Sequence, residues 1–276
     1  MTESWLFTSD DFPTAACRHT ARVKHRHPYL DAPLPLPFAH RGGAAHGDEN
    51  TAGAFERAVK AGFRYVETDV HATADGVPVV IHDADLVRVA GQTARVRTLT
   101  WTDLATIRVG GAAAVPRLDD VLQAWPEVRF NIDVKADSAV EPEMRTVRDT
   151  RSEDRVLLAS FSDARLTRIR SLGGARIATS LGMRAVARLR VASMAGIPLR
   201  LPPSAIAAQV PVRPGRLTVV TRRFVSYAHR LGLQVHVWTI DDPVEMNRLL
   251  DLGVDGIMTD RIEVLREVLT ERGSWH

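Results

Sequence analysis

The chain has 276 residues, 45% of them hydrophobic, which is enough for one large domain or two small ones with a substantial core. Its net charge of +3 comes from arginines scattered through helix-like segments, which argues against a nucleic-acid partner and favours a small anionic one. A single cysteine, Cys17, excludes an intrachain disulfide, and no apolar stretch reaches bilayer-spanning length, so we expect a cytoplasmic protein without a transmembrane segment.

Residues 1–34 are polar and non-periodic, and predict an N-terminal extension to a domain at residues 35–276. Short apolar runs then alternate with segments of helical apolar spacing. This alternation predicts an α/β fold, a (β/α)8 TIM barrel, although an open doubly wound sheet has the same local pattern. The predicted strands are residues 36–40, 65–70, 128–134, 155–160, 176–180, 205–210, 233–239 and 255–259.

The first predicted strand runs directly into His40 and Arg41, which are followed by Gly42 and Gly43. Active sites of (β/α)8 barrels lie at the C-terminal ends of the strands, so these residues are expected at the barrel mouth. Arginine can bind a phosphate through two parallel hydrogen bonds, and glycine lets the backbone approach an anion closely, although a Gly-Gly pair is more often only a turn. This strand end therefore predicts an anion site.

The second predicted strand continues into another extended run without an intervening helix. Asp75 and Gly76 predict a two-residue hairpin turn between the two runs. Such a turn would place Asp69 opposite His82, and directly opposed residues share a face. We therefore expect a hairpin that returns His82 to the barrel mouth.

Acidic residues share one face of two successive predicted strands: Glu67 and Asp69 on the first, and Asp133 beside Lys135 on the next. Two carboxylates about 6 Å apart repel by about 3 kcal/mol at an effective dielectric constant near 20, so a cation or a raised pKa must relieve them. The alternative to a metal site is that Glu67 and Asp69 lie on an exposed edge strand, where water screens both carboxylates. Glu67, Asp69 and Asp133 form an all-oxygen set that suits Mg²⁺ or Ca²⁺ better than zinc.

His40 and His82 have two interpretations at such a site. They could ligate zinc, or they could act as an acid and a base, because the pKa of histidine lies near neutral pH. Arg41 and Lys135 add two positive charges at the same mouth. The other histidines, His46, His71, His229 and His236, are expected to be surface or packing residues.

Five motifs, HRGGAAHGDENT, ETDVHATADGVPVVIHD, NIDVK, VHVWTID and GVDGIMTD, resemble the successive signatures of the glycerophosphodiester phosphodiesterase family. The resemblance covers roughly residues 36–270 in the right order. It implies a TIM barrel with a hairpin after the second strand and a divalent metal ion. It also implies hydrolysis of a small-molecule phosphodiester, a glycerophosphodiester, to sn-glycerol 3-phosphate and an alcohol.

The resemblance also assigns roles. It implies that His40 and His82 are the acid/base pair and that Glu67 and Asp69 are metal ligands. It implies phosphate contacts for Arg41 and Lys135. Glu49 would orient the first loop or face the metal, and Trp238 would form an apolar wall for the substrate. Periodicity alone fits Trp238 equally well as a core residue. Asp133 stands where the family usually has glutamate, and Asp48 where it usually has proline.

Two other functions fit the pattern less closely. Lysophospholipase D or sphingomyelinase D-like cleavage of a lipid head group would favour an exposed apolar rim, for which residues 182–189 and 193–205 are weak candidates. The second of these functions is that of a non-catalytic barrel that only binds phosphodiesters. The presence of both histidines together with Glu67 and Asp69 argues against it, because binding alone does not need two titrating groups.

Overall fold

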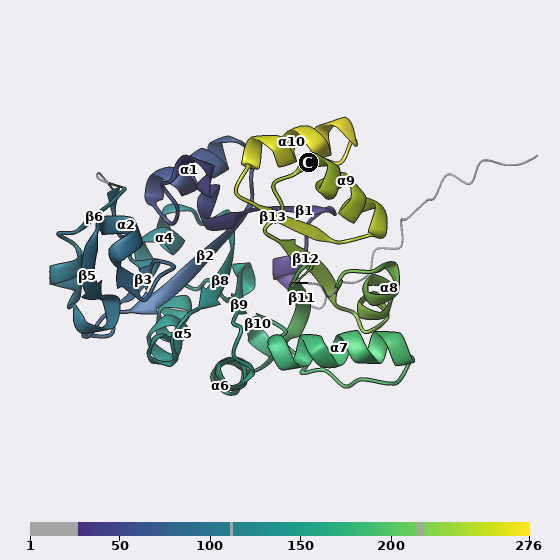
Figure 1. Ribbon diagram of the computed structural model, residues 1–276. Coiled ribbons are helices and arrows are strands. Elements are labelled where there is room, and N and C mark those ends of the chain that lie inside the picture. The colour runs from purple at the N-terminus through teal and green to yellow at the C-terminus, as the bar shows by residue number, and fades with distance from the viewer. Residues whose placement is uncertain (1–26, 111–112, 214, 216–217) are drawn as a thin grey trace, which may run out of the picture.

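The structure, a computed structural model, describes residues 27–110, 113–213, 215 and 218–276 (Figure 1). Strand β1 pairs with both β2 and β13, so eight parallel strands close into a ring. This confirms the predicted (β/α)8 barrel, and each predicted strand overlaps one strand of the ring. The ring consists of β1 (Leu36–Ala39), β2 (Tyr65–Ala72), β8 (Arg129–Val134), β9 (Val156–Ala159), β10 (Ala178–Ser180), β11 (Ala205–Pro211), β12 (Gln234–Trp238) and β13 (Gly256–Thr259).

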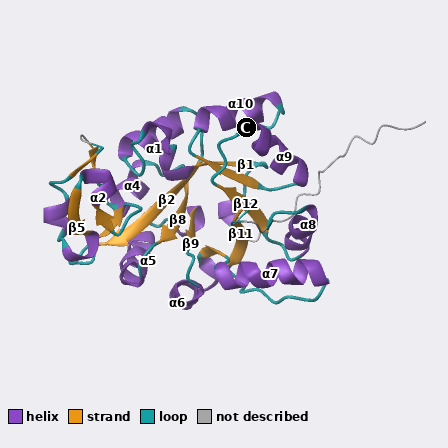
Figure 2. Cartoon of the chain, in the orientation of Figure 1, coloured by secondary structure: helices purple, strands orange, loops and turns teal. Residues whose placement is uncertain are grey.

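A helix follows each strand and covers the outside of the ring (Figure 2). Several of these helices begin at a hydroxyl side chain, as when Thr51 accepts a hydrogen bond from the Ala54 N–H. In the described part of the chain, no helix is long and apolar enough to cross a membrane. The eight helices are α1 (Ala52–Lys60), α4 (Leu118–Ala124), α5 (Val140–Asp149), α6 (Asp163–Gly173), α7 (Met183–Ala195), α8 (Arg222–Arg230), α9 (Pro243–Leu252) and α10 (Ile262–Glu271).

The inside of the barrel is filled by side chains that alternate along the strands, among them Phe38 and Tyr65. A short helical turn, Pro28–Leu30, adds buried Tyr29 to this cluster, and the Tyr65 hydroxyl donates a hydrogen bond of 2.6 Å to its carbonyl. Residues 27–34, which the sequence assigns to the N-terminal extension, thus pack against the barrel. The remainder of the predicted extension, with Cys17, lies outside the described residues.

The predicted hairpin after the second strand is present, but its predicted register is wrong by one residue. Val70 pairs with Val80, so Ile81 rather than His82 lies opposite Asp69. The loop has three residues instead of two: the Thr73 carbonyl accepts from the Gly76 N–H, and Gly76 takes a φ of +79°. The added residue shifts every pair, and β3 (Pro78–Val80) ends before His82.

An insertion between the hairpin and α4 forms a small cluster of its own around buried Val79, Leu86 and Leu104. Its strands were not predicted from the sequence, because they are only two to four residues long. Its elements are β4 (Asp85–Leu86), α2 (Val87–Ala90), β5 (Gln92–Arg95), α3 (Trp101–Leu104), β6 (Arg108–Val109) and β7 (Ala113–Ala114).

Glu143 on α5 is fully buried, and neither of its carboxyl oxygens has a hydrogen-bond partner among the described residues. Burial, with a further contribution from Asp133, raises the pKa of this carboxyl well above its usual range. A carboxyl whose pKa is raised by folding destabilises the fold as pH increases above its unfolded pKa. Glu143 should therefore cost stability at neutral pH.

We predict that Glu143→Met raises the free energy of unfolding by about 1–3 kcal/mol at neutral pH, since it removes an unsatisfied buried polar group. The gain should shrink at a pH near 3, where the wild-type carboxyl is protonated in both states. Denaturant titrations at both pH values measure it, with Glu141→Met on the exposed face of the same helix as the control. A loss of stability, or a gain that does not change with pH, would contradict this account.

Candidate active site

The backbone turns sharply where β1 ends. Arg41 has a φ of +52°, and Gly42 and Gly43 have φ values of +84° and +87°. A Cβ on Gly42 would lie 2.8 Å from Phe55 of α1, so the glycines let the turn pack tightly against the neighbouring helices. This packing gives the glycine pair a structural role. The turn also aims the Arg41 N–H at Glu67, whose Oε2 accepts its hydrogen bond at 3.1 Å.

The Arg41 side chain is held by two carboxylates. Its Nη1 donates a hydrogen bond of 3.0 Å to Glu49, and its Nε lies 3.2 Å from Asp69 Oδ2. Glu49 also pairs with Arg88 of the insertion, at 2.7 and 2.8 Å. Burial disfavours the charge on Glu49, but Arg88 and Arg41 outweigh it and lower the pKa of Glu49. In these contacts Glu49 joins the first loop to the insertion.

Asp69 and Asp133 lie side by side because β2 and β8 pair in that register. The Lys135 Nζ lies between them, 2.8 Å from Asp69 Oδ1 and 2.6 Å from Asp133 Oδ2. Burial alone would raise the pKa of Asp69, but Lys135 and Arg41 outweigh it and lower this pKa. Asp133 has no second cation so close, and burial leaves its pKa raised despite Lys135.

Glu67, two residues before Asp69 on the same face, is the least compensated of these carboxylates. Burial and the charge of Asp69 raise the pKa of Glu67 to about 7. The nearest cationic group is His40, whose Nε2 lies 3.7 Å from Glu67 Oε2. The predicted repulsion between the two carboxylates is thus relieved partly by a raised pKa.

His40 has a second carboxylate partner that the sequence analysis missed. Its Nδ1 lies 2.7 Å from Oδ1 of Asp260, which directly follows β13. Burial disfavours the charged imidazole, but Glu67 and Asp260 outweigh this and raise the pKa of His40. Asp260 is itself held in place by Asp241, whose carboxylate accepts a hydrogen bond of 2.8 Å from the Asp260 N–H. The position of Asp260 at a strand end is the signal that could have identified it.

One further residue was missed. Asn50 donates a hydrogen bond of 2.9 Å to Asp69 and accepts one of 2.7 Å from Thr68, which fixes the Asp69 carboxylate. His71, which was expected to be a surface or packing residue, is buried, and strand alternation places it on the face of Glu67 and Asp69. Its Nε2 lies 3.2 Å from the carbonyl of His82, so it ties the hairpin's return segment to β2.

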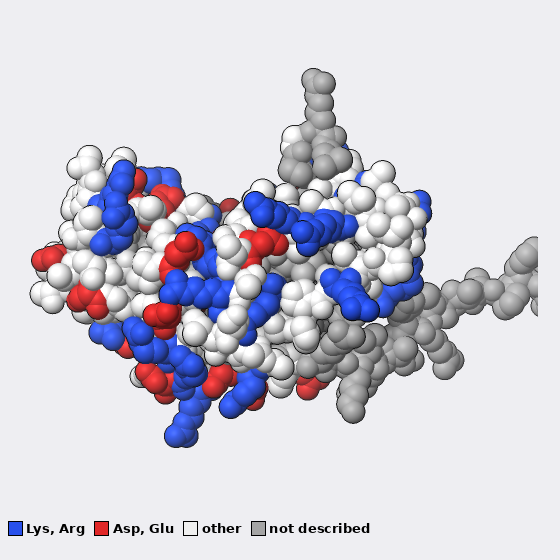
Figure 3. Space-filling view, turned by 90° about the horizontal axis from the view of Figure 1, so that it is seen from below, with Lys and Arg blue, Asp and Glu red and all other residues white. Residues whose placement is uncertain are grey.

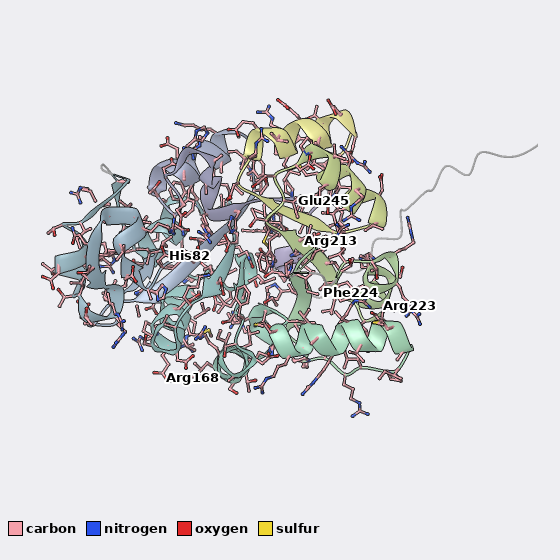
Figure 4. All side chains as sticks on the ribbon, in the orientation of Figure 1. His82, Arg168, Arg213, Arg223, Phe224 and Glu245 are labelled. Carbon is pink, nitrogen blue, oxygen red and sulfur yellow. The ribbon has the colours of Figure 1, made fainter. Side chains whose placement is uncertain are left out.

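His82 itself lies near β2 and β3 (Figure 4), with its Nδ1 2.6 Å from Asp83. Within the described residues its side chain makes no ion pair with the carboxylates around Lys135. Asp83 in turn binds Arg88, which connects His82 to Glu49. The structure thus places His82 at the edge of this network.

Trp238, at the C-terminal end of β12, stacks edge-on against Phe161, with ring centroids 5.6 Å apart. Phe161 is about half exposed, and its ring lies 5.9 Å from the Lys135 Nζ. The two rings therefore form an apolar surface beside the charged cluster. Trp238 is partly buried and also packs against the apolar cluster inside the barrel.

The donor chemistry of Glu67, Asp69 and Asp133 fits a hard divalent cation: all are buried oxygen donors, and Asp133 Oδ1 has no hydrogen-bond partner among the described residues. They are not gathered into a metal site, however. No three His, Cys, Asp or Glu side chains in the described ranges are close enough to hold an ion, and Lys135 lies between Asp69 and Asp133 instead.

Comparisons with known proteins agree with the residue pattern. The model of the glycerophosphoryl diester phosphodiesterase family matches residues 40–264. The chain is 41% identical to the "Probable glycerophosphodiester phosphodiesterase 2" of Mycobacterium tuberculosis over 87% of this chain and 92% of that protein. It is 26% identical to lysophospholipase D GDPD1 of Rattus norvegicus, over 86% of each chain.

A solved structure shares the fold. The phosphodiesterase OLEI02445 of Oleispira antarctica, solved in complex with the product sn-glycerol-3-phosphate, superposes with a TM-score of 0.72 at 19% identity, over 86% of this chain and 97% of that one. Together with the family match, the barrel and its charged mouth define a phosphodiesterase-type TIM barrel. The chain belongs to the glycerophosphoryl diester phosphodiesterase family.

We predict that Asp260→Asn lowers the pKa of His40, because it removes one of the two carboxylates that favour the imidazolium. Titration of the His40 ring by NMR in chelator-treated protein measures this directly. Asp242→Asn, at the start of the neighbouring α9, is a matched control that should leave His40 unchanged. An unaltered His40 titration in Asp260→Asn would show that the 2.7 Å contact does not control the charge of this histidine.

Proposed function

We propose that this protein hydrolyses glycerophosphodiesters to sn-glycerol 3-phosphate and an alcohol, and that residues 35–276 form the catalytic domain. The observation that carries the proposal is the buried cluster at the barrel mouth. It combines carboxylates with Arg41 and Lys135, and it lies beside His40. Such a site offers positive charge for a phosphodiester and a titratable group next to it.

A divalent cation, Mg²⁺ or Ca²⁺, would neutralise the phosphodiester and help to activate the attacking oxygen. Glu67, Asp69 and Asp133 are the residues that would hold it. Two observations support this assignment: the raised pKa of Glu67, and Asp133 Oδ1, which has no hydrogen-bond partner among the described residues. Both indicate negative charge that the described cations compensate incompletely.

Arg41 and Lys135 would bind the phosphate oxygens. Arg41 is held between Glu49 and Asp69, so its guanidinium is already oriented before a substrate arrives. Lys135 remains positively charged, because Asp69 and Asp133 outweigh burial and raise its pKa. Both positive charges would stabilise the transition state more than the bound substrate, because negative charge builds up on the phosphoryl oxygens in the transition state.

His40 and His82 would transfer the protons. One takes the proton of the attacking oxygen, either water or the glycerol 2-hydroxyl, and the other protonates the departing alkoxide as the P–O bond breaks. Asp260 binds Nδ1 of His40, which leaves Nε2 to face the cluster. Trp238 and Phe161 would line the path of the leaving alcohol.

A second candidate is the cleavage of a lysolipid head group. The exposed ring of Phe161 beside Trp238 favours it, because an acyl chain needs an apolar surface at the mouth. A relative named lysophospholipase D is consistent with it. An assay of glycerol 3-phosphate release from glycerophosphodiesters, together with head-group release from lysolipids, separates the two functions.

We predict that His40→Ala and His82→Ala each lower kcat by on the order of 10² or more, the usual contribution of a general acid or base. Circular dichroism should show an intact fold. His46→Ala, at an exposed histidine on the same loop as Glu49, is the control and should turn over normally. Near wild-type turnover by either test variant would remove that histidine from the mechanism.

Asp133 can be tested separately, because it is either a metal ligand or only a partner of Lys135. We predict that Asp133→Asn raises the metal concentration for half-maximal activity at least about tenfold, or roughly 1.4 kcal/mol of lost binding. Asp133→Glu should stay active at ordinary metal levels. A metal titration of both variants decides, and an unchanged midpoint for Asp133→Asn would exclude Asp133 as a ligand.

A further inference from the structure

The charges of this protein are divided unevenly along the chain. From Ala164 to Ile240 the sequence contains thirteen arginines and no lysine, aspartate or glutamate. The rest of the chain therefore holds 23 of the 36 basic residues and all 33 acidic ones. The acid-free segment runs from α6 to β12, which are consecutive neighbours around the barrel. Among its described arginines, Arg165, Arg168 and Arg176 pair with carboxylates of neighbouring elements.

The figures show the same division. In Figure 3, which views the molecule from the side of α6 and α7, acidic side chains gather on one half, while basic and uncharged side chains dominate the visible part of the other. Figure 4 labels three arginines of the segment, Arg168, Arg213 and Arg223, on the part of the barrel that carries α6 and α8. A surface of this kind attracts polyanions.

A hollow of about 440 Å³ lies between α6, α7 and residues 199–202, and four arginines line it: Arg170, Arg184, Arg188 and Arg200. Asp163 is the one acidic residue of its lining, and its carboxylate already accepts the N–H groups of Arg184 and Ala185 at the start of α7. Among the described residues, the guanidinium groups of Arg184, Arg188 and Arg200 make no hydrogen bond or ion pair. Their charges are thus available to an anion.

Apolar side chains accompany these arginines. Met183, Val191, Met194 and Ile197, on α7 and the residues just after it, are each more than half exposed. On the helix they alternate with Arg184 and Arg188 around the face that is turned away from the barrel. Aliphatic and cationic side chains together fit the boundary between lipid head groups and acyl chains. They fit nucleic acid less well, because α7 has no aromatic side chain on which a base could stack and its aliphatic side chains would stay exposed beside the phosphates.

We propose that this surface, the exposed face of α7 with residues 196–200, docks the protein on an anionic phospholipid bilayer. The hollow would take a lipid phosphate, and the exposed aliphatic side chains would enter the head-group layer. The surface begins at the barrel mouth, because the N–H of Met183 bonds to the carbonyl of Phe161. Docking would thus keep the mouth close to the membrane surface.

Vesicle sedimentation tests the proposal. The whole protein should bind vesicles of phosphatidylcholine mixed with phosphatidylglycerol, and bind poorly to phosphatidylcholine alone or at high salt. Arg184→Glu with Arg188→Glu should lower the partition coefficient at least about tenfold. The matched control, Arg95→Glu with Arg97→Glu, makes the same charge change at exposed arginines of the insertion and should bind normally.

A second double variant, Met194→Ser with Ile197→Ser, keeps every charge and should also weaken vesicle binding. Hydrolysis of a water-soluble glycerophosphodiester should be unchanged in all these variants, so the docking surface and the proposed activity can fail independently. Equal binding to neutral and anionic vesicles, or unaltered binding by the arginine variant, would overturn the proposal. So would tighter binding to duplex DNA than to anionic vesicles.

Discussion

The charge balance between Asp69, Asp133 and Lys135 is the constraint on which the site depends. Two buried carboxylates on neighbouring strands repel each other strongly, and one lysine bridges both at less than 3 Å. Arg41 adds a second positive charge to Asp69, but Glu67 keeps a pKa near 7. Negative charge at Glu67 and Asp133 is therefore compensated incompletely by the protein itself, which is the electrostatic reason to expect a cation there.

This constraint involves one part of the barrel. The four strands that end at the cluster, β13, β1, β2 and β8, are consecutive neighbours in the ring. The turn after β1 supplies His40 and Arg41, and the residue after β13 supplies Asp260. The strands from β10 to β12 belong to the acid-free segment instead. The charged cluster and the arginine-rich segment thus lie on different parts of the barrel.

Much of this arrangement was predictable, because it follows from the two-residue period of strands. That period placed Glu67 with Asp69, and the pairing of β2 with β8 confirms that Asp133 joins them. What failed depends on non-local geometry. A third loop residue, Ala74, shifted the hairpin register, and no local pattern distinguishes a two-residue turn from a three-residue turn there. Asp260 lies 220 residues from His40, so their contact exists only once the barrel closes.

The central claim is that a bound divalent cation completes the charge balance at this mouth and enables hydrolysis. The most direct test is the release of glycerol 3-phosphate from a glycerophosphodiester by protein treated with EDTA, before and after Mg²⁺, Ca²⁺ or Mn²⁺ is added back. The account predicts no turnover in the chelated protein and recovery with at least one of these ions. Full turnover by the chelated protein would contradict it.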